Sequence, residues 1–246
     1  MAKRAMGPVA QPAAGDLPDG HHGARTLIEQ AYTRLRDDIV EGRLAPGEKL
    51  RVEHLKDRYG VGAGTLREAI TRLASDALVV AEGQRGFRAS PIAIDDLQDL
   101  TALRLHIEIE ALRQSIRRGG AAWRAGVEQA WTRLSAVEQP LTAATRPCWE
   151  VLNTQFHDAL IAAGASAWTL KVLRLLSRHG ERYRRYAIAL PGQTRDVHAE
   201  HRLIVDMALS GQEARAALAL EAHIRATPDQ LIDAHRRGLP WDQRLA

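Results

Sequence analysis

The sequence predicts a mainly α-helical protein in two parts, the first with a small β-hairpin and the second an all-α bundle of about six helices. Alanine, leucine, arginine and glutamate dominate the chain, and these residues favour helices. Aromatic residues make up only 4% of the sequence, which disfavours a large β-sandwich or barrel. From Ile94 onward, apolar residues recur at helical spacing and no strand pattern interrupts them.

Breaks in composition divide the 246 residues. The first residues are rich in glycine, proline and alanine and lack periodicity, and the capping-box pattern Thr26-x-x-Glu29 predicts where the first helix begins. Ser90-Pro91 is a natural boundary, and we expect Pro228 to end the last helix. The predicted parts are a disordered leader (1–24), a first domain (25–90), an all-helical domain (91–230) and a C-terminal tail (231–246).

Charge and cysteine content exclude several classes of protein. The chain has 34 Lys and Arg residues against 30 Asp and Glu residues, and no segment is strongly basic, so net charge is weak evidence for nucleic-acid binding. The single cysteine, Cys148, rules out an internal disulfide and a cysteine-based zinc site. Charges interrupt every apolar run well before the roughly 20 residues that span a membrane, and the N-terminus lacks the apolar stretch of a signal peptide. We therefore expect a cytoplasmic protein.

Residues 52–73 have the spacing of a helix-turn-helix, in which the second helix enters the major groove of DNA. Two short amphipathic patterns flank the turn at Gly60-Val61-Gly62. This spacing alone also fits an ordinary helical hairpin. The order helix, helix, turn, helix and hairpin is more specific, because Leu78–Val80 and Phe87–Ala89 flank a glycine-containing loop that predicts a wing.

Several polar side chains of this winged helix-turn-helix are placed to reach DNA. Arg67, on the recognition helix, is the foremost candidate because arginine forms paired hydrogen bonds with guanine or binds phosphate. The other predicted DNA-binding residues are Thr65, Arg85, Arg51 and Gln84.

The first domain carries residues typical of one family. These are Ile39–Leu50, Tyr59-Gly60-Val61, Leu66–Ile70 with Leu73, and Arg85-Gly86-Phe87. On these residues, Leu27–Ala89 resembles the winged helix-turn-helix of the GntR family of bacterial transcription regulators. The family commonly has Ser-Arg-Thr where this chain has Gly62-Ala63-Gly64. An arginine that often contacts DNA in the family and a good N-cap hydroxyl are therefore missing. We expect the base specificity to differ from that of typical members. The resemblance implies a homodimer on a short palindromic operator of double-stranded DNA, which agrees with the small surface that one module buries.

Four side chains of the second domain could ligate a metal ion. Asn153 and His157 lie four residues apart on one predicted helix, His201 lies on the next-to-last helix and His223 on the last. Imidazole is the commonest metal ligand near neutral pH, and helical bundles hold such sites between facing helices. A lone histidine on an apolar helix face is more often a packed or surface residue, so these positions alone leave a structural role open.

The second domain also carries a family pattern. Its segments are Leu97–Glu108, Asn153–His157, Glu200–Ala208 and Ala216–His223. On these segments, residues 94–227 resemble the all-helical effector-binding domain, the FCD domain, of the FadR subfamily of GntR regulators. In many members an Asp or Asn and three histidines at these positions hold a divalent metal, often zinc or nickel. The neutral amide of Asn153 cancels none of the metal's charge, so we expect weaker affinity than with Asp; His179 and His198 are expected beside the site or facing solvent.

The resemblance further implies a small carboxylate effector beside the metal. Arg104 matches the family's cation for this carboxylate, although an ion pair with Glu108 on the same helix has equal weight. Arginines wrap around the helix near residue 180, so most are expected to face solvent, with Arg182 pointing inward as a second effector-binding candidate. Residues 59–89 and 182–184 are closest to a branch of the subfamily linked to dicarboxylate catabolism.

Three functions remain open on the sequence. The favoured one is a DNA-binding transcriptional regulator, in particular a repressor, controlled by a carboxylate bound beside the metal. A metal-dependent hydrolase with an accessory DNA-binding-like domain is the alternative; Glu200 is a carboxylate next to a proposed ligand, but no His-Glu-x-x-His or Gly-x-Ser-x-Gly motif is present. In the third, the protein is a structural dimer whose histidines only pack.

Overall fold

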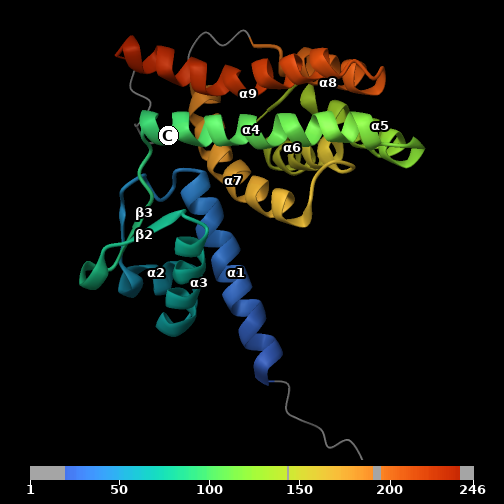
Figure 1. Ribbon diagram of the computed structural model, residues 1–246. Helices are drawn as coiled ribbons and strands as arrows, with labels where there is room; N and C mark the ends of the chain where they lie inside the picture. The colour runs from blue at the N-terminus through green and yellow to red at the C-terminus, as the bar shows by residue number, and fades with distance from the viewer. Residues whose placement is uncertain (1–19, 143, 191–194, 239–246) are drawn as a thin grey trace, which may run out of the picture.

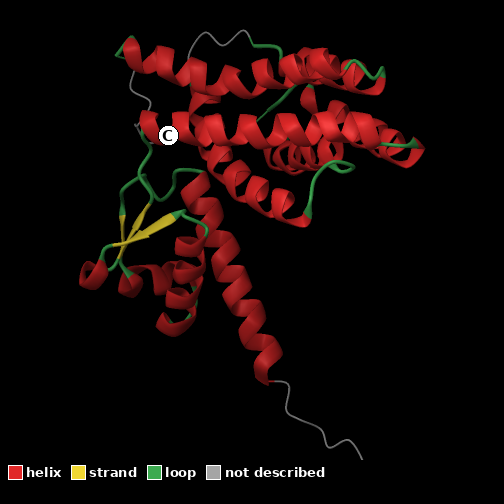
Figure 2. Ribbon diagram, viewed as in Figure 1, coloured by secondary structure: helices red, strands yellow, loops and turns green. Residues whose placement is uncertain are grey.

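The computed structural model describes residues 20–142, 144–190 and 195–238. An N-terminal head contains three helices and all the strands of the described residues, and a bundle of longer helices follows it (Figures 1 and 2). The mainly α-helical prediction is confirmed, including six helices in the described part of the bundle. These bundle helices are α4 (Ile94–Arg118), α5 (Ala121–Glu138), α6 (Arg146–Ile161), α7 (Ala167–Ala189), α8 (Val197–Leu209) and α9 (Glu213–Arg236).

The head is a winged helix-turn-helix. Its helices are α1 (Gly20–Val40), α2 (Val52–Tyr59) and α3 (Ala63–Ser75), and its strands are β1 (Lys49–Leu50), β2 (Val79–Ala81) and β3 (Phe87–Ala89). The antiparallel sheet has the order β1-β3-β2, with Val79 opposite Ala89, and a single 3₁₀ turn, Gly83–Arg85, forms the tip of the wing. Gly60 has a left-handed backbone (φ +66°), which lets α2 end sharply before α3.

The head has its own apolar core, which holds α3 in place. Leu35 of α1 and Leu66, Ile70 and Leu73 of α3 are fully buried. Burial of each such side chain contributes about 1.5–3 kcal/mol. The apolar spacing that predicts the helix-turn-helix is therefore the spacing that packs it, and the opposite face of α3 is left to solvent.

The bundle helices pack around a second core. Leu112 of α4, Leu134 of α5, Phe156 of α6 and Ile204 of α8 are among its fully buried members. Helix α4 lies along α9, and α5 lies along α6 (Figure 1). None of the helices in the described part of the chain is long and apolar enough to cross a membrane.

Two predicted boundaries are wrong. Helix α1 begins at Gly20 rather than near Thr26, so only residues 1–19 of the predicted leader lie outside the described residues. Pro228 does not end the last helix but lies inside α9, so residues 231–236 of the predicted tail are helical. Leu231 and Ala234 are fully buried beyond the proline, and their packing compensates for the hydrogen bond that proline removes from the helix.

Helix α7 connects the bundle to the head. It packs on α1, and its His179 Nε2 lies 3.0 Å from the backbone oxygen of Asp76, the residue that ends α3. Arg178 forms an ion pair of 2.8 Å with the Asp76 carboxylate, which also accepts a hydrogen bond from Tyr32 of α1. The recognition helix is thus attached at its C-terminal end to a helix of the bundle.

Candidate functional site

Three histidines from three helices meet inside the bundle. His157 of α6, His201 of α8 and His223 of α9 each offer a ring nitrogen, and these atoms all lie within 4.8 Å of one another. The ring centroids of His201 and His223 are 4.5 Å apart, and those of His157 and His223 are 5.3 Å apart. The three histidines predicted as metal ligands are therefore brought together.

Two buried atoms at this cluster lack a hydrogen-bond partner in the described part of the chain. They are Oδ1 of Asn153 and Nε2 of His201, whose residues are 4% and 0% exposed. Leaving a buried polar atom unpaired costs about 1–3 kcal/mol. An amide oxygen and three imidazole nitrogens are a suitable ligand set for a first-row divalent ion, so the residues present fit a metal.

Two glutamates orient the imidazoles from outside. His201 Nδ1 lies 2.8 Å from Glu138 Oε1, and His223 Nδ1 lies 2.8 Å from Glu200 Oε2. A carboxylate on Nδ1 fixes the proton there and leaves Nε2 as the lone-pair nitrogen, the arrangement usual around metal-binding histidines. Glu138 is a residue that sequence reasoning missed, because nothing in local spacing links the end of α5 to α8.

Burial keeps two of these imidazoles neutral. It lowers the pKa of His157 and of His223 well below the ordinary value, and the neighbouring His201 lowers both pKa values further. Burial opposes ionisation of Glu138, yet the hydrogen bond and charge of His201 lower the net pKa of this carboxyl group. His157 and His223 therefore present unprotonated nitrogens beside an ionised outer carboxylate, which is the state that a metal requires of these ligands.

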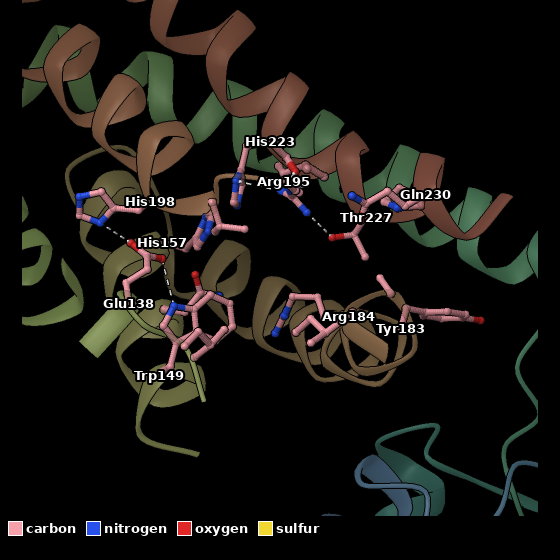
Figure 3. A pocket seen from close by; sticks show the side chains of 18 of the residues that line it. Glu138, Trp149, His157, Tyr183, Arg184, Arg195, His198, His223, Thr227 and Gln230 are labelled. Atoms are coloured by element: carbon pink, nitrogen blue, oxygen red, sulfur yellow. Dashed lines mark hydrogen bonds and ion pairs between the residues drawn. The ribbon is translucent and has the colours of Figure 1, made fainter. Parts of the chain in front are cut away.

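A cavity of about 470 Å³ opens beside the histidines. At one end lie Glu138, Trp149, His157, His198 and His223, and α7 and α9 extend the cavity away from them (Figure 3). Trp149 Nε1 donates to Glu138, and His198 Nδ1 lies 3.2 Å from the same carboxylate, so His198 borders the cluster, as expected.

The structure separates the two predicted effector-binding arginines. Arg104 lines the cavity and also pairs with Glu108 at 2.9 Å, so the expected ion pair is present and effector binding by this residue stays a prediction. Arg182 does not line the cavity, and that prediction is corrected: its Nη2 donates to the backbone oxygen of Ser90, and the residue is 2% exposed. Arg184 lines the cavity instead, contrary to the expectation of a solvated face.

A third cavity arginine was not predicted. Arg195, just before α8, donates to Glu200, to Thr227 and to the backbone oxygen of His223. It lines the cavity between the histidines and Thr227 (Figure 3). Its only sequence signal is its position five residues before Glu200, which does not indicate a cavity.

The predicted DNA-binding residues lie on one body, the head. Arg51 precedes α2, Thr65 and Arg67 lie in the first turns of α3, and Arg85 ends the wing tip. The three arginines are exposed, and none has a side-chain hydrogen bond or ion pair with another described residue. The side chain of Gln84 lies outside the described residues.

The comparisons with known proteins agree with this arrangement. Residues 27–88 match the model of bacterial regulatory proteins of the gntR family, and residues 99–226 match that of the FCD domain. The chain is 43% identical to the HTH-type transcriptional regulator BphR of Paraburkholderia xenovorans, over 82% of this chain and 84% of that protein. It is 30% identical to the HTH-type transcriptional repressor GlaR of Escherichia coli, over 84% of this chain and 96% of the repressor.

Solved structures show the same fold. A putative GntR transcriptional regulator from Rhodococcus sp. RHA1 superposes with a TM-score of 0.68 at 20% identity, over 85% of this chain and 99% of the other. E. coli McbR/YncC gives a TM-score of 0.64 at 18% identity, over 86% and 98% of the two chains. Both similarities concern the fold alone.

Proposed function

This chain belongs to the GntR family of bacterial transcriptional regulators, with an FCD domain after its DNA-binding head, and we propose that it is a repressor controlled by a carboxylate bound beside a divalent metal. It is a DNA-binding regulator rather than an enzyme, as its relatives are. The single observation that carries the proposal is the buried ligand set with unpaired atoms at Asn153 and His201.

Asn153, His157, His201 and His223 would hold the metal; the donor set suits a first-row divalent ion, and the family resemblance makes zinc or nickel the expected one. When bound, the ion supplies positive charge and open coordination positions to an anionic oxygen of the effector. The protein supplies donors nearby, because Arg104 Nη1 and Arg184 Nη1 both lie against Gly180, at 3.2 and 3.4 Å from the place a Cβ would occupy there. A side chain at position 180 would push these guanidiniums away.

We propose that α7 carries the effector's influence to the head. One side of this helix, including Gly180 and Arg184, lines the cavity, and the other side bears Arg178, His179 and Arg182, which contact the head. A ligand that moves α7 therefore moves the attachment of α3 at Asp76. In a homodimer on a palindromic operator, such a movement changes the spacing of the two recognition helices, and half-sites demand a fixed spacing.

A two-step binding experiment tests the proposal. Metal-free protein, prepared with a chelator, is given zinc or nickel and then short carboxylates, and its melting temperature is followed; ligands that bind only the folded protein raise it. A DNA fragment selected from random sequences by the wild-type protein then serves as the operator. The proposal expects metal to raise the melting temperature and a carboxylate to release the DNA. No metal-induced shift, together with operator binding indifferent to every carboxylate, would contradict it.

A further inference from the structure

The charges around the cavity indicate what kind of carboxylate it accepts. Each arginine that lines the cavity has a glutamate of its own: Arg104 with Glu108 at 2.9 Å, Arg184 with Glu150 at 2.6 Å and Arg195 with Glu200 at 2.6 Å. Glu138 adds a fourth carboxylate at the histidines. Together the three arginines and four glutamates carry a net charge of −1. A divalent ion on four neutral ligands would raise this local charge to +1, and Asp196 on the exposed rim lowers it by one.

All three arginines lie at the metal end. Arg195 Nη2 lies 3.3 Å from His223 Nδ1 and donates to the backbone oxygen of His223. Glu108, the partner of Arg104, lines a small pocket together with His157. Arg104 and Arg184 also approach each other across Gly180. One carboxylate near the ion can therefore use the metal and these guanidinium donors together.

The other end of the cavity is apolar and uncharged. It is formed by the start of α4, the end of α7 and the middle of α9, and its lining residues in the described part of the chain are Leu97, Leu100, Tyr183, Ala187, Ile188, Pro228 and Gln230. Thr227, which accepts a hydrogen bond from Arg195, lies between this end and the histidines. Gln230 lies seven residues beyond His223 on α9, which places this end about 10 Å from the metal ligands. The hydroxyl of Tyr183 is directed outside, to Asp96.

Given the proposed function, we infer that the effector is a monocarboxylate with an extended apolar body, an alkyl or arylalkyl acid, rather than a dicarboxylate. Its carboxylate lies at the metal end, and its body extends about 10 Å along α7 and α9 to Leu97 and Ala187. A second carboxylate would lie there against apolar side chains with no cation to pair with, which is unfavourable. A two- to four-carbon acid would leave most of the 470 Å³ unfilled. The resemblance to a dicarboxylate-linked branch thus does not carry over to this cavity.

Octanoate and octanedioate form a matched pair of probes, because they differ only in the second carboxylate. Titration calorimetry on the zinc- or nickel-loaded full-length protein measures both, with 4-phenylbutanoate as an arylalkyl acid. We expect octanoate and 4-phenylbutanoate to bind at least about tenfold more tightly than octanedioate. Octanedioate binding as tightly as octanoate would overturn the inference and leave the proposed function standing. Failure of every carboxylate to bind the metal-loaded protein would overturn the proposed function and this inference with it.

An added cation provides a second test. Ile188 lines the apolar end and is 38% exposed, so Ile188→Lys places a charge there at little cost to folding. We expect this variant to shift the octanoate-to-octanedioate preference by about tenfold or more toward the diacid. Leu103→Lys is the matched control, because Leu103 of α4 is 46% exposed and does not line the cavity. An unchanged preference in Ile188→Lys, with an unchanged melting profile, would show that the ligand body does not reach this end and would overturn the inference.

Discussion

The predicted DNA-binding arginines of the head and the arginines of the cavity differ in whether they already have partners. Arg51, Arg67 and Arg85 are exposed and form no side-chain ion pair with another described residue. Arg104 and Arg184, in contrast, are largely buried and paired with glutamates. An exposed, unpaired guanidinium is available to phosphates and base edges of a large polyanion, whereas a paired one offers directed hydrogen bonds with little net charge.

The same contrast explains why a net charge of +4 says little about function. DNA binding requires a few unpaired cations on one face, and small-molecule recognition requires a local charge that matches one ligand. Whether a given arginine has a carboxylate partner therefore decides its use, and the overall number of charged residues does not. Four experiments can break or sharpen this comparison, beginning with the largest expected effect.

Removing one imidazole of the buried cluster separates the two regions most sharply. We expect His201→Ala to weaken zinc binding at least about 100-fold, because even the partners behind metal ligands contribute about 10–100-fold. Competition with a chromophoric chelator measures this affinity. Operator binding by the metal-free variant should stay close to that of metal-free wild type, since the head has its own core.

His198→Ala is the matched control for this substitution. His198 lies 3.2 Å from the same Glu138 but stands outside the three-histidine group. We expect its zinc affinity to stay within about tenfold of wild type. Equal losses of zinc affinity in the two variants would contradict the assigned ligand set. If His201→Ala alone does not fold, as shown by the loss of its melting transition, His201→Gln replaces it in the comparison.

On the head, an unpaired arginine should matter more for DNA than a paired one. Arg67→Ala is expected to weaken operator binding by about 1–3 kcal/mol, because a base or phosphate contact is lost. Arg72 lies five residues along α3, pairs with Glu29 at 2.7 Å and stacks over Tyr32, so Arg72→Ala should change affinity less than about threefold. Fluorescence anisotropy with the selected fragment measures both, and the reverse order would overturn the assignment of Arg67.

Local spacing predicts the elements and the imidazoles but not their partners. The helix-turn-helix follows from apolar residues at helical spacing, and the histidines follow from a family pattern on three helices. Glu138 lies 63 residues from His201 in the sequence, and no periodicity signals such a pair. Arg182 and Arg184 could not be assigned correctly, because α7 is covered on one side by the head and on the other by the cavity wall, so both of its faces look alike in sequence.

A charge added at the metal centre should strengthen a site that now relies on neutral ligands. Asn153→Asp replaces a buried amide oxygen with a carboxylate at the same place, and we expect about tenfold tighter zinc binding. The metal-free variant should melt at a lower temperature than wild type, because the new carboxylate is buried without a partner. Chelator competition and melting curves measure the two effects, and Asn153→Ala should weaken binding instead. Unchanged affinity in both variants would remove Asn153 from the ligand set.

The smallest effect is expected where the two regions meet. Arg178→Ala removes the ion pair with Asp76 and the hydrogen bond to Tyr32, both at the end of the recognition helix. We expect this loss to reduce the effector's influence on operator affinity by about 1 kcal/mol, roughly fivefold, while the affinities for operator alone and for metal stay nearly unchanged.

The quantity to measure is the ratio of operator dissociation constants with and without metal plus octanoate. Arg174→Ala is the control, because Arg174 lies one turn earlier on α7 and pairs with Asp158 within the bundle. An equal change of the ratio in both variants would assign the effect to α7 stability rather than to the contact at Asp76. A change confined to Arg178→Ala would show that the contact of Arg178 with Asp76 carries the effector's influence from the bundle to the head.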